Sequence, residues 1–134
     1  MPQADPGSRC AVSAAGGRVR ALFEGHEVAD SDRALACVEP GETARFYFPR
    51  DDVQMSVLRR NDHVTASPWL GPAHWFTIMR DAKIVEDVAW SYETPFDDAA
   101  AIAGYISFDP EHVEIEAEGA APVRRVPPMD PPYA

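Results

Sequence analysis

The chain has 134 residues, a formal net charge of -10, and 46% hydrophobic and 25% charged residues. This length fits one domain, and the composition is that of a globular protein, which excludes a largely disordered chain. No apolar run approaches the roughly 20 residues that a membrane-spanning helix needs, and the first residues lack the pattern of a signal peptide. A cytoplasmic protein with no membrane partner is therefore expected.

The acidic charge is concentrated in one stretch. Residues 84–123 contain ten acidic residues and neither Lys nor Arg. Such a surface repels phosphate backbones and argues against nucleic acid as a partner. Its role is either solubility or an acidic face that contacts another protein, and a homodimer stays open.

Both ends of the chain are predicted to be flexible tails. Residues 1–17 are rich in Gly, Ala, Ser and Pro and show no periodicity, and Cys10 lies among them. Residues 119–134 contain five prolines, which favour extended chain over helix or sheet. The folded domain is thus expected over residues 18–118.

Within that range the dominant hydrophobic period is two. Val19, Ala21 and Phe23 alternate with polar neighbours, which is typical of an antiparallel strand with one face on the core. Residues 75–79 are apolar on both faces and predict a central strand, and residues 80–83 predict a hairpin. The alternation recurs in residues 45–48, 52–57, 84–90 and 112–118. The sequence therefore predicts a mainly β domain, a sandwich or barrel of short antiparallel strands.

One short helix is expected after the strands. Thr94 and Pro95 fit an N-cap followed by proline at the first helical position, and Asp97 adds negative charge at the positive end of the helix dipole. Gly104 suits a left-handed stop.

No metal or cofactor is expected. The two cysteines, Cys10 and Cys37, do not form a Cys-x-x-Cys motif, which excludes a zinc knuckle. His63, His74 and His112 are not spaced like metal ligands. Cys37 is interpreted as a small buried apolar residue.

Four segments of the chain form a distinctive set: Val28-Ala29-Asp30-Ser31 with Ala34-Leu35, residues 47–53, residues 85–92, and Ile102-Ala103-Gly104-Tyr105 with Phe108. In order and spacing, they resemble the bacterial family called domain of unknown function 427, which also carries a nucleotidyltransferase-like label. The resemblance covers about residues 18–118 and implies a β-tent fold that lacks the zinc of related β-tent domains. Where that family usually has Cys-Pro-Tyr-Lys-Gly, this chain has Ser67-Pro68-Trp69-Leu70-Gly71.

Two charged residues are candidates for a ligand site. The planar guanidinium of Arg50 could clamp a carboxylate or phosphate, the alternative being a salt bridge to a neighbouring aspartate. Asp87 lies among the apolar residues Val85 and Ala89 on a predicted strand, so its carboxylate needs a partner or a role, and Arg50 is the cation best placed to pair with it. Glu86 is expected to be exposed on the other face.

Aromatic residues complete the candidate site. Trp69 lies in a loop-like context, and Trp90, Tyr92 and Tyr105 add large rings that either line a pocket or fill the core. His74 is the histidine expected to reach the pocket.

Three functions remain open from the sequence. The first is a module that binds a small polar ligand or a partner in an aromatic-lined cleft of the β domain. The second is a nucleotidyltransferase-like or hydrolytic enzyme, for which no catalytic residues can be assigned. The third is a protein-interaction module that works through its acidic face.

Overall fold

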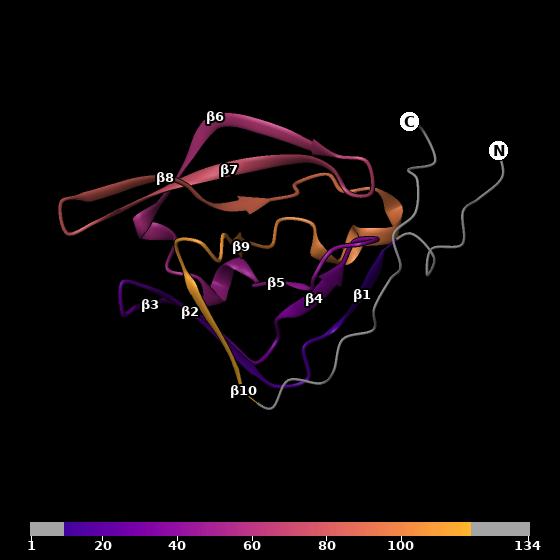
Figure 1. Cartoon of the computed structure of the whole chain (residues 1–134), viewed down its shortest axis with the longest axis horizontal. Coiled ribbons are helices and arrows are strands. Elements are labelled where there is room, and N and C mark those ends of the chain that lie inside the picture. Colours follow the sequence, from indigo (N-terminus) through magenta and orange to yellow (C-terminus); the bar gives the residue numbers. More distant parts are fainter. Residues whose placement is uncertain (1–9, 119–134) are drawn as a thin grey trace, which may run out of the picture.

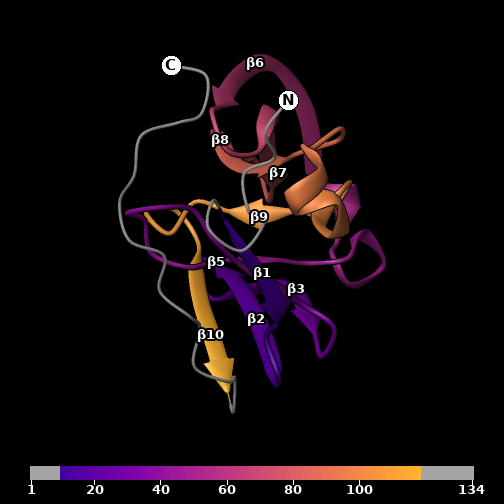
Figure 2. The ribbon, with the colours of Figure 1, turned by 90° about the vertical axis from the view of Figure 1, so that its right-hand side faces the viewer.

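The fold has two layers of antiparallel strands, an upper sheet over two smaller sheets (Figures 1 and 2). The structure, a computed structural model, describes residues 10–118. The upper sheet has the strand order β6 (Leu58–Ser67), β7 (Gly71–Arg80), β8 (Lys83–Ser91), β9 (Ser107–Phe108). The two lower sheets have the orders β1 (Ala11–Ala14), β4 (Leu35–Val38), β5 (Arg45–Tyr47) and β10 (Glu114–Glu118), β2 (Arg18–Phe23), β3 (His26–Ser31). The predicted mainly β, antiparallel class is confirmed, and over residues 10–118 the sheets do not close into a barrel.

Local sequence explains several of these strands. In β2, Val19, Ala21 and Phe23 are buried, as their period of two predicts. The predicted hairpin at residues 80–83 is confirmed, because Arg80 pairs with Lys83. The two residues between them, Asp81 and Ala82, have φ of 50° and 64°. Positive φ at both central positions gives the type I′ turn that matches the twist of the flanking strands.

The buried apolar residues form two clusters rather than one. The last residue of β5 and the residue after it belong to different clusters, because successive side chains of an extended chain point to opposite faces. Phe48 is fully buried in the larger cluster with Ile78, whereas Tyr47 is buried in a second cluster with Leu70 and Ile102. The upper sheet therefore covers both clusters.

The N-terminal boundary of the domain differs from the prediction. Residues 10–17 were expected in a flexible tail, but β1 pairs with β4 and lies next to the buried residues Cys10 and Ala15. The short Ala/Ser-rich strand has no alternation of its own and none of its four residues is fully buried, so its place in the domain comes from pairing with β4 and from the buried residues on either side. The expected tails at residues 1–9 and 119–134 lie outside the described residues.

The predicted helix is present but begins later and is of a tighter type. It is the 3-10 helix η3 (Asp97–Ile102), whose N-cap is Phe96 rather than Thr94. Its backbone kinks at Ala99, and Gly104 takes the positive φ expected of a stop, 77°. Two single-turn 3-10 helices, η1 (Arg50–Asp52) and η2 (Met55–Val57), precede β6.

Two bulges flank the central strand β7. Between the pairs Arg60–Phe76 and Val64–His74, residues 61–63 of β6 face a single residue of β7. On the other side of β7, between the pairs Phe76–Ala89 and Ile78–Val85, residues 86–88 of β8 also face a single residue. Bulges bend a strand and redirect its side chains. These two bulges lie at neighbouring levels of β7.

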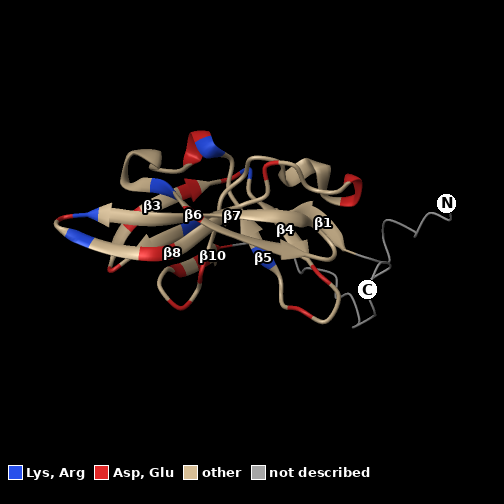
Figure 3. Ribbon diagram, turned by 90° about the horizontal axis from the view of Figure 1, so that it is seen from above, with Lys and Arg blue, Asp and Glu red and all other residues tan. Residues whose placement is uncertain are grey.

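Acidic residues lie on several separate elements, among them β8, as Figure 3 shows. The acidic stretch found in the sequence is divided among β8, the η3 region and β10. Among residues 10–118, no helix has the length and hydropathy to cross a membrane.

Candidate functional site

The two bulges bring Asp87 and His63 together on the outer side of the upper sheet. The Nδ1 atom of His63 is 2.9 Å from Oδ2 of Asp87. Asn61 donates to Oδ1 of Asp87 at 2.9 Å and to the Thr77 hydroxyl at 3.1 Å. Because a carboxylate only accepts, the hydrogen on Nδ1 of His63 points to Asp87, and Nε2 remains as the second polar atom of the ring. The side chains of His63 and Asp87 are 49% and 39% exposed.

Asp87 has a backbone conformation that is unusual for a strand residue. Its φ is 58°, in the left-handed region. Non-glycine residues in this region carry strain of about 1–2 kcal/mol, although Asp tolerates it better than most. The bulge and the two hydrogen bonds from Asn61 and His63 hold the residue there. The carboxylate consequently points away from the core, which the predicted alternation with Val85 and Ala89 would not give.

Three rings stand side by side across β6, β7 and β8. The His63 ring stacks on Trp75 with centroids 5.5 Å apart, and Trp75 and Trp90 have centroids 5.2 Å apart. The indole N–H of Trp75 donates to the Thr65 hydroxyl at 3.0 Å, and that of Trp90 donates to the Tyr47 hydroxyl at 3.0 Å. The stacked ring of Trp75 and the hydrogen bond to Asp87 together fix the orientation of the His63 imidazole.

Arg50 is engaged in a different place, between η1, β8 and η3. Its Nη2 lies 2.8 Å and 3.0 Å from the two carboxylate oxygens of Glu93, and its Nε donates to the carbonyl oxygen of Gly104 at 2.6 Å. The buried Ser91 hydroxyl also donates to Glu93, at 2.8 Å. The guanidinium lies over the Phe76 ring, 5.6 Å from its centroid. Arg50 therefore joins distant segments, and its predicted pairing with Asp87 is wrong.

The segment from Ser67 to Gly71 forms a closed turn between β6 and β7. The Ser67 hydroxyl accepts the backbone N–H groups of Trp69 and Leu70, both at 3.1 Å, and donates to Glu39 at 3.0 Å. Trp69 is only 6% exposed and packs in the second core cluster. Ser67 thus stabilises a turn, and among residues 10–118 the base that it contacts is the half-buried carboxylate of Glu39.

Burial raises the pKa of Glu39 despite the hydrogen bond from Ser67. A carboxyl whose pKa is higher in the folded protein gives less stability as the pH rises from its unfolded-state pKa to its folded-state pKa. We therefore expect Glu39→Gln, which keeps the acceptor for Ser67, to gain up to about 1 kcal/mol relative to wild type at pH 7. Urea unfolding at pH 7 and pH 5 should show this gain shrinking on acidification. The exposed Glu86, changed to Gln, is the control, because it is not among the groups that raise the pKa of Glu39. A gain independent of pH would contradict the assignment.

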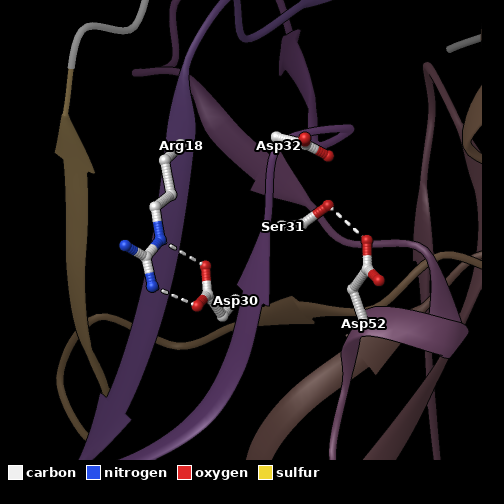
Figure 4. A pocket seen from close by; sticks show the side chains of 5 residues that line it. All are labelled: Arg18, Asp30, Ser31, Asp32 and Asp52. Atoms are coloured by element: carbon white, nitrogen blue, oxygen red, sulfur yellow. Dashed lines mark hydrogen bonds and ion pairs between the residues drawn. The ribbon is translucent and has the colours of Figure 1, made fainter.

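An open pocket of about 260 Å³ lies at the end of β3, lined by Arg18, Asp30, Ser31, Asp32 and Asp52 (Figure 4). Arg18 binds Asp30 through two hydrogen bonds, and hydrogen bonding by Arg18 is the main reason the pKa of Asp30 is lowered. Ser31 donates to Asp52 at 2.6 Å, and Asp52 also pairs with Arg33. The polar atoms of this pocket mostly bind one another. Within residues 10–118, no group of three or more His, Cys, Asp or Glu side chains could hold a metal.

The structure does not bring the seven predicted site residues into one cleft. Trp69 and Tyr92 are core residues, each 6% exposed, and burial raises the pKa of the Tyr92 hydroxyl. Arg50 binds Glu93, and His74 binds the Arg60 guanidinium at 2.7 Å through Nδ1. Tyr105 is half-buried and packs against the second cluster. Trp90 is half-buried and also packs against the second cluster, Asp87 stays half-exposed at the bulge, and Glu86 is exposed as expected.

Comparison with known protein families identifies the chain. A family described as "Domain of unknown function (DUF427)", with the short name NTP_transf_9, matches residues 11–119. The chain belongs to this family. The predicted resemblance is confirmed, and the DUF427 match begins at β1 rather than at residue 18. None of the curated proteins compared with the chain matches it.

The segments that carried the DUF427 resemblance meet in the folded domain. Ser31 of the first segment binds Asp52 of the second, and Arg50 of the second binds Gly104 of the last. These contacts hold the two layers together. The outer site, in contrast, contains Asn61 and His63, which sequence reasoning did not select. The only signal for them was a polar run in β6, and the bulges that direct them to Asp87 have no pattern in the sequence.

Proposed function

We propose that this DUF427 domain is a binding module for a small, neutral, polar ligand, held on the outer face of β6–β8 by the pair His63 and Asp87. The observation that carries the proposal is the half-exposed carboxylate of Asp87, kept in the left-handed region inside a strand. Strained residues of this kind occur preferentially at functional sites. Bulges likewise occur preferentially next to such sites, where they redirect a side chain.

The polar atoms at the site indicate the chemistry of the ligand. Nε2 of His63 accepts a hydrogen bond in the neutral ring, and the Asp87 carboxylate keeps lone pairs beyond those used by His63 and Asn61. The ring nitrogen and the carboxylate can therefore both accept hydrogen bonds from ligand donors such as hydroxyl groups. The adjacent row of Trp75 and Trp90 offers apolar surface to a ring.

Charge at the site excludes one class of ligand. Asp62 and Glu86, both exposed, lie in the same two bulges as His63 and Asp87. Carboxylates so close together repel a phosphate ester. A nucleoside or a monosaccharide, which combines hydroxyl donors with a ring, fits better than a nucleotide.

The experiment is a titration of the labelled protein with adenosine, followed by changes in the backbone amide resonances. We expect shifts confined to residues 61–63, 75–77 and 85–90, with weaker shifts from adenosine monophosphate. Asp87→Asn keeps the side-chain shape and the tolerance of positive φ but removes the charge, so it should weaken binding about tenfold or more. Glu86→Gln is the matched control and should bind as wild type. Tighter binding of the monophosphate, or equal binding by Asp87→Asn, would contradict the proposal.

A hydrolytic or nucleotidyltransferase enzyme is the second candidate. A carboxylate bonded to Nδ1 of a histidine orients the ring as a general base, and His63 and Asp87 have this arrangement. Incubation with a nucleoside triphosphate and magnesium, with pyrophosphate release as the readout, tests it. Release that is abolished by His63→Ala would favour this candidate over a binding module.

A further inference from the structure

Strand β10 is the outer strand of its sheet (Figure 2). Within residues 10–118 it pairs with β2 alone, so the backbone N–H and C=O groups along its other edge have no strand partner there. An open edge of this kind is a template to which an extended chain can add.

Charge on the outer face of this sheet alternates from strand to strand. Glu116 on β10 lies 3.4 Å from Arg20 on β2, and Arg20 lies 3.3 Å from Glu27 on β3. On this face, acidic side chains of β10 and β3 thus lie on either side of the basic side chain of β2. Glu114 and Glu118 form no ion pair with any described residue. A basic strand beside β10 would continue the alternation and give these two glutamates partners.

The other face of β10 borders an apolar groove. Ile115 and Ala117 alternate with the glutamates and line it, and its volume is about 200 Å³. Phe46 and Phe108 also line the groove, and Arg45 is its one charged lining residue. A strand added beside β10 would therefore need aliphatic side chains toward the groove and basic side chains toward the glutamates.

We propose that the open edge of β10 binds an extended segment of a partner protein in which Lys or Arg alternates with aliphatic residues. The added segment makes backbone hydrogen bonds with β10, its aliphatic side chains enter the groove beside Phe46, and its basic side chains pair with Glu114 and Glu118. This surface is separate from the His63–Asp87 site, and its test does not depend on that site.

The probe is a fluorescent peptide of alternating Lys and Val, long enough to span β10, and its binding is measured by anisotropy. We expect binding to the full chain that weakens with added salt. Glu114→Lys with Glu118→Lys should weaken it about tenfold or more, because each reversed charge repels the peptide. The exposed pair Glu86→Lys with Asp97→Lys changes the net charge equally and should bind as wild type. Equal weakening in both double variants would overturn the proposal, since it would show attraction to net charge alone.

A second pair of probes tests strand addition itself. Alternate residues of an added strand point their N–H groups toward β10 and away from it. N-methylation of one alternate set should abolish binding, and methylation of the other set should leave it unchanged. Identical behaviour of the two methylated peptides would overturn the proposal. Binding of a peptide of residues 119–134 without binding of the Lys/Val probe would also overturn it, by assigning the edge to the chain itself.

Discussion

Replacing Ala15 with Asp should lower the free energy of unfolding by about 3–5 kcal/mol. Ala15 is 1% exposed, lies in the larger core cluster, and donates its backbone N–H to the carbonyl oxygen of Ala34 at 3.0 Å. A carboxylate at this position is buried without a cation to pair with it, which is among the most costly single changes in a protein. Urea unfolding of the full chain measures the loss.

The preceding residue provides the matched control. Ala14 is the last residue of β1 and is exposed, so Ala14→Asp should change stability by no more than about 0.5 kcal/mol. If Ala15→Asp were as mild as Ala14→Asp, then β1 would not be part of the packed domain in solution.

Arg50→Met should cost about 2–3 kcal/mol. Met keeps most of the apolar length of the side chain but removes the donors to Glu93 and to the Gly104 carbonyl. The side chains of Arg50 and Glu93 are 37% and 31% exposed, so water compensates part of the loss and the cost stays below that of a fully buried pair.

Two further variants distinguish the contacts of Arg50 from a general loss of charge. Arg50→Lys keeps the charge but not the planar fork that reaches two partners at once, so its stability should be intermediate. Arg59→Met removes an exposed arginine of β6 and should be near neutral. Equal stability of Arg50→Met and Arg59→Met would show that Arg50 does not hold these segments together.

The sequence predicted the parts of the fold in which local pattern and burial agree. The alternation in β2 and the polar hairpin at residues 80–83 are of this kind. Strand β1 could not be predicted, because its small residues have no alternation and join the domain only by pairing with β4. Tyr47 points opposite to Phe48, as the alternation predicts, but a second cluster buries that face too, and no local pattern reports a cluster built from distant segments.

The candidate site shows the same limit more sharply. The sequence singled out Asp87 as a carboxylate that needs a partner or a role and named Arg50 as that partner, whereas the structure pairs Asp87 with His63 and Asn61. Val85 and Ala89 still share the core side, opposite Ile78 and Phe76, but the bulge of residues 86–88 and the positive φ of Asp87 break the alternation between them. Val88 and Ala89 are both fully buried for this reason. Arg50 instead forms an ion pair with Glu93, an acid far along the chain that only the packing of η3 brings near.

The central claim is that the strained carboxylate of Asp87 serves a ligand rather than stability, and Asp87→Gly tests it most directly. Glycine takes positive φ without steric cost, which offsets the hydrogen bonds lost to His63 and Asn61. The free energy of unfolding in urea should therefore stay within about 1 kcal/mol of wild type, while the response of the amide resonances to adenosine disappears. A loss of about 3 kcal/mol or more with the response intact would contradict the account and make Asp87 a structural residue.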